Sequence, residues 1–276
     1  MAEIRVMTPG DIEPVFKIVD SMNWGYFDYD LKRMIEFDPL GNFVAVDDGR
    51  IIGINFSSQA EEFAFIGPVI VLPEFRGHKI GENLMAAIIE HLEKAGATTI
   101  ELDSVFPAAP LYRRLGFRDK YFSYRFRKQI EWPKQPIQKF EQSMTGDLLA
   151  LNYKLTGLDR STHLRRFCAE YADSIYVINK DKLRAFGLVR SRNGDIFRLG
   201  PLVAEDDETA LVLFDKICGE YSGQTLTLGV LESNRRFIRH LRAQDFIHTV
   251  PALRMYRGEK LRYEANMYAI MSPEKG

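Results

Sequence analysis

The pattern of apolar and polar positions is clearest in the middle of the first half of the chain. Residues 68–72 are apolar and mostly β-branched, which is typical of a strand buried inside a sheet. After a polar turn, the apolar side chains of Leu84, Ile88 and Leu92 recur at helical spacing. The pattern therefore predicts a buried strand, a tight turn and the start of a helix.

The turn itself, residues 76–81, favours an anion. It contains two glycines and three potential cations, and it lacks a carboxylate. The first backbone N–H groups of a helix have no partner within the helix, and they point at whatever lies in such a turn. The chain has no Gly-x-x-x-x-Gly-Lys-Ser/Thr segment and no Gly-x-Gly-x-x-Gly segment. Nucleoside triphosphate chemistry is therefore disfavoured.

A second strand and helix follow this arrangement. Residues 99–103 are typical of a strand, and a Pro-containing loop separates them from the segment 111–117, Leu-Tyr-Arg-Arg-Leu-Gly-Phe. Gly116 can end a helix in the left-handed conformation at little cost. Phe117 is expected to begin a strand that returns to the sheet.

These two motifs resemble those of the GNAT N-acyltransferase superfamily. The acyl-CoA loop of that family reads Arg or Gln, two residues of any kind, Gly, one residue of any kind, then Gly or Ala. Arg76 and Gly81 match this pattern, and Lys79 stands where the middle Gly is expected. Lys79 still offers its backbone N–H if its φ is negative, and its ammonium adds charge near the phosphates of CoA. The segment 111–117 resembles the short Tyr-bearing helix that closes the family's domain.

The resemblance implies a fold, a reaction and a binding site. The implied fold is α/β, with an α+β mixed sheet in two tandem acyl-CoA N-acyltransferase domains. The implied reaction is direct transfer of an acetyl group from acetyl-CoA, a co-substrate, to an amine in one ternary complex, without a metal. The implied cofactor-binding residues are Val69, Ile70, Val71, Arg76, Gly77, His78, Lys79, Ile80 and Gly81.

Two catalytic tasks follow from this implied reaction. The thioester oxygen gains charge and needs a donor, for which a backbone N–H near Val69 or Val71 is the candidate. The departing thiolate benefits from a proton donor, and Tyr112 stands where many family members keep a tyrosine. The alternative for Tyr112 is a half-buried aromatic side chain whose hydroxyl merely finds a partner.

The acceptor amine arrives mostly protonated and needs a base or a water chain. Asp103, at the carboxyl end of its expected strand, is the best-placed candidate. The alternative is that Asp103 is solvated and takes no part in proton transfer. Other carboxylates on or beside the central strands keep the assignment open: Glu61, Glu62 and Glu101.

The acceptor is expected to contact residues 22–30, which combine aromatic side chains with two acids. Trp24, Tyr26 and Asp28 are the candidate substrate-binding residues, and this composition suits a cationic or amphipathic amine. The segment 160–166 is rich in Arg and would instead favour an acceptor that bears a carboxylate. A small free amine or an amino acid is the preferred acceptor.

The second half of the chain repeats the first. Residues 66–70 align with residues 199–203 at an offset of 133, and residues 132–136 read as an extended linker. The sequence therefore predicts a CoA-binding domain over 1–130 and a degenerate GNAT-like domain over 131–276. The second copy carries four acids between Val203 and Thr209, which would repel a pyrophosphate.

Composition narrows the remaining possibilities. The formal net charge of −1 gives no electrostatic reason to bind nucleic acid. Cys168 and Cys218 show no metal or redox spacing and are expected to be buried. The first residues are polar and no apolar run reaches membrane-spanning length, so a cytoplasmic monomer or homodimer without a membrane partner is expected. Two rival functions stay open: a non-catalytic acyl-CoA sensor, and a transferase that uses a longer acyl or aminoacyl donor.

Overall fold

The computed structural model describes residues 2–22 and 26–276. Contacts between residues divide the chain into two compact units. The first unit consists of Met1–Lys120, Arg254–Lys260 and Pro273–Gly276, and the second of Tyr121–Leu253 and Leu261–Ser272. The first unit therefore takes in two segments from the far end of the sequence.

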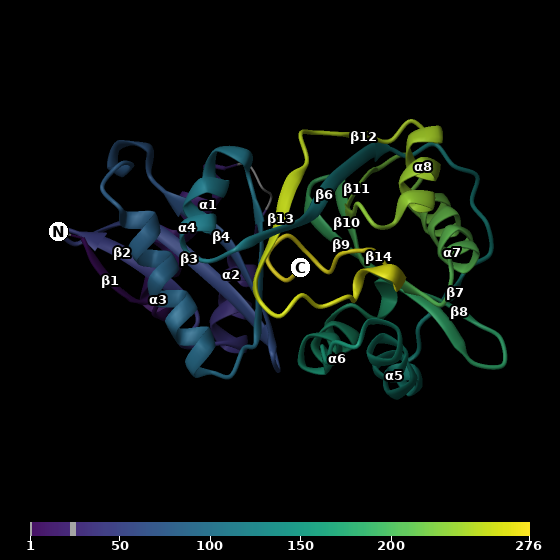
Figure 1. Ribbon diagram of the computed structural model, residues 1–276. Coiled ribbons are helices and arrows are strands. Elements are labelled where there is room, and N and C mark those ends of the chain that lie inside the picture. Colours follow the sequence, from purple (N-terminus) through teal and green to yellow (C-terminus); the bar gives the residue numbers. More distant parts are fainter. Residues whose placement is uncertain (1, 23–25) are drawn as a thin grey trace. The chain divides into compact units, whose positions relative to one another are not determined.

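The first unit is built on a mixed sheet (Figure 1), as expected from the family resemblance. Its strands lie in the order β1-β2-β3-β4-β5-β13. β4 and β5 are parallel, whereas β1 to β4 pair antiparallel. The elements are β1 (Glu3–Val6), α1 (Ile12–Asp20), α2 (Asp28–Phe37), β2 (Phe43–Asp47), β3 (Arg50–Ala60), β4 (Phe63–Val71), α3 (Ile80–Lys94), β5 (Thr99–Ser104), α4 (Ala109–Arg114) and β13 (Ala252–Gly258).

The helices of this unit cover both faces of the sheet. Ile54 of β3 belongs to the apolar cluster beneath α1 and α2, whereas the neighbouring Gly53 faces Leu84 of α3. Successive strand residues point to opposite faces, so α3 lies on the face away from α1 and α2. The apolar positions predicted for α3, which are Leu84, Ile88 and Leu92, are all buried, and so are their neighbours Met85 and Ile89.

The second unit repeats this plan. Its strands lie in the order β6-β11-β10-β9-β8-β7, with β12 beside β6 and β14 beside β10. Cys168 and Cys218 are both buried here, as predicted. The elements are β6 (Arg118–Gln129), β7 (Gln138–Lys139), α5 (Thr145–Thr156), α6 (Ser161–Glu170), β8 (Ile175–Asn179), β9 (Leu183–Asn193), β10 (Ile196–Ala204), α7 (Asp207–Glu220), β11 (Thr225–Leu231), α8 (Arg235–Ala243), β12 (Ile247–His248) and β14 (Met267–Ala269).

The predicted repeat is present in the strands themselves. β3 and β9 begin at Arg50 and Leu183, and β4 and β10 begin at Phe63 and Ile196, which is an offset of 133 residues each time. β10 runs parallel to β11 as β4 does to β5. The two units therefore share one strand plan, and differences between them at equivalent positions are informative.

The strand that follows Phe117 returns to the sheet, as expected. In the strand order β6 is a neighbour of β13, and from Ser123 onward it pairs antiparallel with β11. The position beside β5 is taken by β13. β13 carries Arg254, which pairs with two carboxylates on β5, Glu101 and Asp103. The compact units thus differ from a single division of the chain after residue 130.

Candidate active site

The first unit contains an opening between two parallel strands. β4 pairs with β5 only from Phe63 to Ile66, the last pair being Ile66 with Leu102. β4 then continues to Val71, and over Val69–Val71 its register is with β3 on the other side. In the described register, the edge of β4 beyond Ile66 is therefore left for a ligand, and such an edge presents N–H and C=O groups that can bind an extended amide-rich chain.

The expected phosphate loop lies directly after this edge. The Arg76 side chain is exposed and its Nε donates to the carbonyl oxygen of Val71 at 3.1 Å, which ties the loop to the end of β4. Gly77 takes a φ of +83°, and the exposed His78 ring nitrogen Nδ1 lies 3.3 Å from the Phe75 carbonyl oxygen. α3 begins at Ile80, so its first N–H groups point into the loop.

The backbone φ of Lys79 is not negative, as the sequence analysis required for its N–H to face a bound phosphate. Its φ is +60° and not negative, and it forms the left-handed N-cap of α3. A glycine adopts this conformation without a Cβ penalty, which explains why the family pattern has Gly there. Lys79 is exposed, so its ammonium is accessible to an anion bound in the loop.

Replacing Lys79 with glycine is expected to raise the free energy of unfolding by about 1 kcal/mol, because a left-handed conformation costs an L-residue about that much. The same change should weaken acetyl-CoA binding several-fold through loss of one cation. Thermal unfolding and acetyl-CoA titration measure the two effects. Lys79→Met keeps the strained backbone but removes the charge, so it should weaken binding without raising stability. Unchanged stability in Lys79→Gly would contradict the strain argument.

Tyr112 lies on α4 and its side chain is buried, with 8% of its surface exposed. Its ring packs edge-to-face on Phe117, with centroids 6.1 Å apart. Burial raises the pKa of the Tyr112 hydroxyl to about 12. The hydroxyl therefore stays protonated through the neutral range, which is the state that a proton donor needs.

Asp103 is part of a buried cluster of charges. Its carboxylate oxygens accept from Arg254 Nε at 2.6 Å and from Nη2 at 3.1 Å. Glu101, two residues earlier on β5, accepts from Arg254 Nη1 at 3.2 Å and from Lys120 Nζ at 2.6 Å. The side chains of Glu101, Lys120 and Arg254 are fully buried. Asp103 thus has a structural partner in addition to its predicted part in proton transfer.

Arg254 and Lys120 were missed by the sequence interpretation. The available signal was the pair of acids at alternate positions of an otherwise apolar strand, since two carboxylates on one face require cations when buried. This pattern indicates that cationic partners are needed, but it does not indicate which Lys or Arg residues supply them. Arg254 also lies over the ring of Phe65, 4.7 Å from its centroid.

The structure describes two of the three predicted substrate-binding residues, and they lie in different surroundings. Trp24 lies outside the described residues. Tyr26 is buried, and its hydroxyl donates to Glu274 Oε2 at 3.0 Å. Asp28 begins α2 on the surface, where it pairs with Lys32 at 2.8 Å. The structure thus brings Tyr26 into the interior of the first unit, whereas Asp28 faces solvent.

The equivalent opening in the second unit is closed. β10 leaves β11 after Leu199, but β14 then pairs with β10 at Leu202 and Val203. At the start of α7, the side chain of Asp206 accepts from the backbone N–H of Thr209 at 2.8 Å. Both groups that an acyl-CoA would use, the strand edge and the helix start, therefore have partners from the chain itself.

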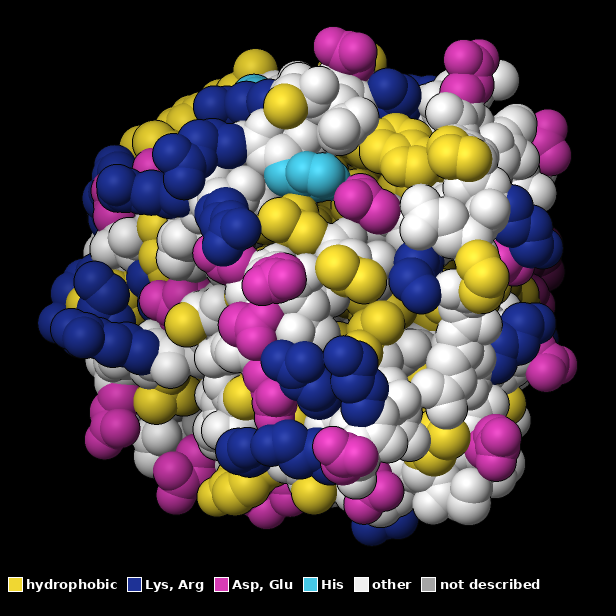
Figure 2. Space-filling view, turned by 90° about the vertical axis from the view of Figure 1, so that its right-hand side faces the viewer, with side chains coloured by type: hydrophobic (Ala, Val, Ile, Leu, Met, Phe, Trp, Pro, Cys, Tyr) yellow, Lys and Arg dark blue, Asp and Glu magenta, His cyan; other side chains and the backbone are white. Residues whose placement is uncertain are grey.

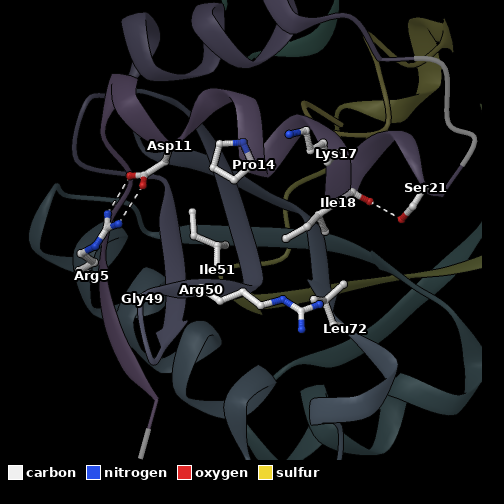
Figure 3. A pocket seen from close by; sticks show the side chains of 10 residues that line it. All are labelled: Arg5, Asp11, Pro14, Lys17, Ile18, Ser21, Gly49, Arg50, Ile51 and Leu72. Atoms are coloured by element: carbon white, nitrogen blue, oxygen red, sulfur yellow. Dashed lines mark hydrogen bonds and ion pairs between the residues drawn. The ribbon is translucent and has the colours of Figure 1, made fainter.

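A groove of about 460 Å³ lies elsewhere on the first unit, between α1 and the turn that joins β2 to β3 (Figure 3). None of the predicted site residues lines it. Its polar groups largely pair with one another or with neighbours: Arg5 with Asp11 at 2.7 Å, Lys17 with Glu13 at 2.8 Å and Arg50 with Glu74 at 3.0 Å. The groove is therefore separate from the candidate active site.

Charges on the visible face of the molecule are mixed in sign. Figure 2 shows Lys and Arg side chains interspersed with Asp and Glu and separated by hydrophobic patches.

Within residues 2–22 and 26–276, no group of three or more His, Cys, Asp or Glu side chains is arranged to hold a metal ion. In that same part of the chain, no helix has both the length and the hydropathy needed to cross a membrane.

Both halves of the chain match a single kind of domain. Residues 13–117 match the acetyltransferase (GNAT) family, and residues 148–269 match an acetyltransferase (GNAT) domain. The chain is 25% identical over 256 residues to the holothin acyltransferase of a Pseudoalteromonas species, which covers 90% of this chain and 85% of that protein.

Solved structures share the fold over nearly the whole chain. A protein from Pyrococcus horikoshii has a TM-score of 0.81 at 21% identity and covers 100% of this chain and 96% of its own. A tandem GNAT protein from the clavulanic acid biosynthesis pathway has a TM-score of 0.65 at 14% identity, covering 94% of this chain and 98% of its own.

Proposed function

Because the chain belongs to the GNAT acetyltransferase family and is a tandem acyltransferase, we propose that it transfers an acetyl group from acetyl-CoA to a primary amine. The acceptor is a small molecule or an amino acid, and the amine attacks directly while both substrates are bound. Proteins of this family use acyl-CoA and an amine acceptor. The further proposal is that the first unit alone binds the donor.

The main support for this proposal is that the two units differ at the strand edge and at the helix start where an acyl-CoA would bind. In the first unit, the described register of β4 with β5 ends at Ile66, and β4 continues to Val71 and then into the loop at the start of α3. In the second unit, β14 occupies the equivalent edge of β10 and Asp206 caps the equivalent helix. Two units with the same strand plan thus differ where a pantetheine arm and a pyrophosphate would bind.

The chemistry assigns a task to each group. The neutral amine nitrogen attacks the thioester carbonyl carbon, the C–S bond breaks, and the thiolate takes the proton of the Tyr112 hydroxyl. A backbone N–H near Val69 or Val71 stabilises the carbonyl oxygen. The proton lost by the amine leaves through a base, for which Asp103 is the candidate.

Tyr112→Phe is expected to lower kcat about 100-fold, because a positioned proton donor contributes at least that much. The KM for acetyl-CoA should change little, since the hydroxyl acts on the leaving thiolate. Steady-state assay of free thiol measures both constants. Tyr176→Phe, which removes the hydroxyl of a buried tyrosine in the second unit, should leave kcat unchanged. Full turnover by Tyr112→Phe would leave Tyr112 with a packing role only.

The pooled-amine experiment separates an enzyme from a sensor. The protein is incubated with acetyl-CoA and a pool containing putrescine, tyramine, glucosamine and lysine, and free thiol is followed. Thiol release that depends on an amine supports the proposal, whereas binding of acetyl-CoA without amine-dependent release supports the sensor. The holothin acyltransferase is named for acyl transfer in general, so propionyl-CoA and butyryl-CoA are compared as donors. Faster turnover with either would overturn the assignment of acetyl.

A further inference from the structure

Each unit contains a pair of parallel strands that separate at the same place. In the first unit, the last register pair of β4 with β5 is Ile66 with Leu102. In the second unit, the last register pair of β10 with β11 is Leu199 with Leu228. Ile66 and Leu199 are each the fourth residue of their strand. The two units can therefore be compared directly at the point of separation.

In the second unit, the chain itself occupies the place between the separating strands. β14 pairs with β10 at Leu202 and Val203. Just beyond β14, the backbone N–H of Ile270 donates to the carbonyl oxygen of Gly229 on β11 at 2.9 Å. A Cβ built on Gly229 would lie 2.7 Å from the Ile270 side chain, so this segment is closely packed. Residues 267–270 thus bond to both strands where they part.

In the first unit, the same place on β5 carries two carboxylates that share one arginine. Glu101 and Asp103 stand on either side of Leu102, the last residue of β5 in register with β4. Arg254 Nε and Nη2 donate to the two carboxylate oxygens of Asp103 at 2.6 and 3.1 Å. Its Nη1 donates to Glu101 at 3.2 Å. We call these contacts the Arg254 bridge.

The Arg254 bridge also reaches β4. The guanidinium carbon lies 4.7 Å from the ring centroid of Phe65, which is the register partner of Glu101. Arg254 belongs to β13, which lies beside β5 on the side away from β4, and its side chain is fully buried. The equivalent residues of β11 are Thr227 and Gly229, which carry no charge. The same bridge therefore cannot form in the second unit.

We propose that Arg254 is a positioning residue for the acyl-CoA donor. It ties the carboxyl end of β5 to β13 at the point where β5 leaves β4, and so keeps the backbone groups of β4 beyond Ile66 available to the pantetheine arm. In the second unit, β14 takes the corresponding place. This inference rests on the proposed function. It adds that a residue from the far end of the sequence sets the donor-binding edge of the first unit.

The expected effect on affinity follows from how often the strands are parted in this way. Backbone groups that lack partners pair where they can, so β5 released from Arg254 would pair further with β4 or lose its fixed place. If the parted arrangement were then populated a tenth of the time, the Kd for acetyl-CoA would rise about tenfold. The described hydrogen bonds of Arg76 and His78 run to Val71, Pro73 and Phe75 and not to β5. The phosphate loop should therefore be spared.

Two ligands separate the strand edge from the phosphate loop. Acetyl-CoA uses both, whereas 3′-phosphoadenosine 5′-diphosphate carries the phosphates and lacks the pantetheine arm. Arg254→Lys keeps a cation, but one ammonium lacks the fork that reaches both carboxylates. We expect it to raise the acetyl-CoA Kd about tenfold and to change the nucleotide Kd less than twofold, as measured by calorimetric titration, with competition for the nucleotide. An equal change for both ligands, or an unchanged acetyl-CoA Kd, would overturn the inference.

A second variant serves where Arg254→Lys does not fold. Asp103→Asn keeps the shape of the side chain and removes the charge that Arg254 holds, so it should raise the acetyl-CoA Kd several-fold and again spare the nucleotide. Because both measurements are of binding, a part of Asp103 in proton transfer does not affect them. Unchanged acetyl-CoA binding in Asp103→Asn would count against the Arg254 bridge as the element that sets the edge.

Arg257→Met is the matched control. Arg257 lies on the same strand and pairs with Glu93 of α3 at 2.8 Å. Its loss should leave both Kd values unchanged. A rise in the acetyl-CoA Kd as large as that of Arg254→Lys would mean that general loosening of β13 explains the effect, and the inference would be wrong.

The outcome for the unmodified protein keeps the two proposals distinguishable. If it does not bind acetyl-CoA, the proposed function and the inference both fail. If it binds acetyl-CoA and Arg254→Lys binds it equally well, only the inference fails. Amide exchange of the free protein adds a readout without a ligand: Arg254→Lys should speed exchange at least tenfold at residues 101–104 but not in α3, and equal exchange there would contradict the inference.

Discussion

Replacing Arg254 with methionine is expected to lower the free energy of unfolding by about 3–5 kcal/mol, because it leaves buried carboxylates without their cation. Arg254 contacts both Asp103 and Glu101, and its side chain is fully buried. Urea unfolding measures the loss, and amide exchange in β5 locates it. We expect β5 to lose protection before the strands of the second unit do.

Two controls separate charge from packing in this experiment. Arg257→Met removes a partly exposed arginine from the same strand, which pairs with Glu93, and should cost about 1 kcal/mol or less. Arg254→Met combined with Asp103→Asn leaves Glu101 with Lys120 and should recover about half of the loss. A loss below about 1 kcal/mol in Arg254→Met alone would show that the buried charges are not held as described.

Gly81→Asp is expected to weaken acetyl-CoA binding several hundredfold. Gly81 is the second residue of α3, where a carboxylate would stand beside a bound phosphate. Like charges about 4 Å apart near a protein surface repel by about 4 kcal/mol. The free protein should nevertheless gain about 0.3–1 kcal/mol of stability, because an acid in the first turn complements the helix dipole. Equilibrium dialysis with acetyl-CoA and thermal unfolding measure these opposite effects.

The uncharged substitutions at the same position isolate the charge. A Cβ on Gly81 would make only ordinary contact with Val71 at 3.7 Å, so Gly81→Ala fits the site. Gly81→Asn has the shape of the aspartate without its charge and should bind within about tenfold of the unmodified protein. If Asn weakened binding as much as Asp, space and not charge would control the loop.

The sequence was sufficient for the features that depend on neighbouring residues. The apolar positions of α3, the turn before it and the matching strands of the second half follow from local periodicity and from comparison of the chain with itself. The four acids near Asp206 follow from the same comparison of the two halves, and in the structure Asp206 caps the helix there.

Pairing between distant segments could not be predicted in the same way. The buried partner of Glu101 and Asp103 is Arg254, which lies 153 and 151 residues further along the chain. No local pattern in residues 99–104 indicates a partner at that separation. The β14 strand that closes the second opening is only three residues long, too short for a periodicity to reveal it.

Backbone conformation at one residue was also beyond the sequence. The interpretation of Lys79 depended on the sign of its φ, and a lysine gives no signal that it will adopt the left-handed region. The value of +60° follows from the path of the chain between Gly77 and α3. Similarly, the buried hydrogen bond of Tyr26 could not be predicted, because its partner Glu274 lies 248 residues away in the sequence.

The central claim is that one acyl-CoA binds, at the edge of β4 and the start of α3, and that the second unit binds none. Calorimetric titration of acetyl-CoA into the unmodified protein, Gly81→Asp and Asp206→Asn tests it most directly. We predict one site per chain in the unmodified protein, loss of that site in Gly81→Asp and no change in Asp206→Asn. Two sites per chain, no binding at all, or a site that survives Gly81→Asp would contradict the account.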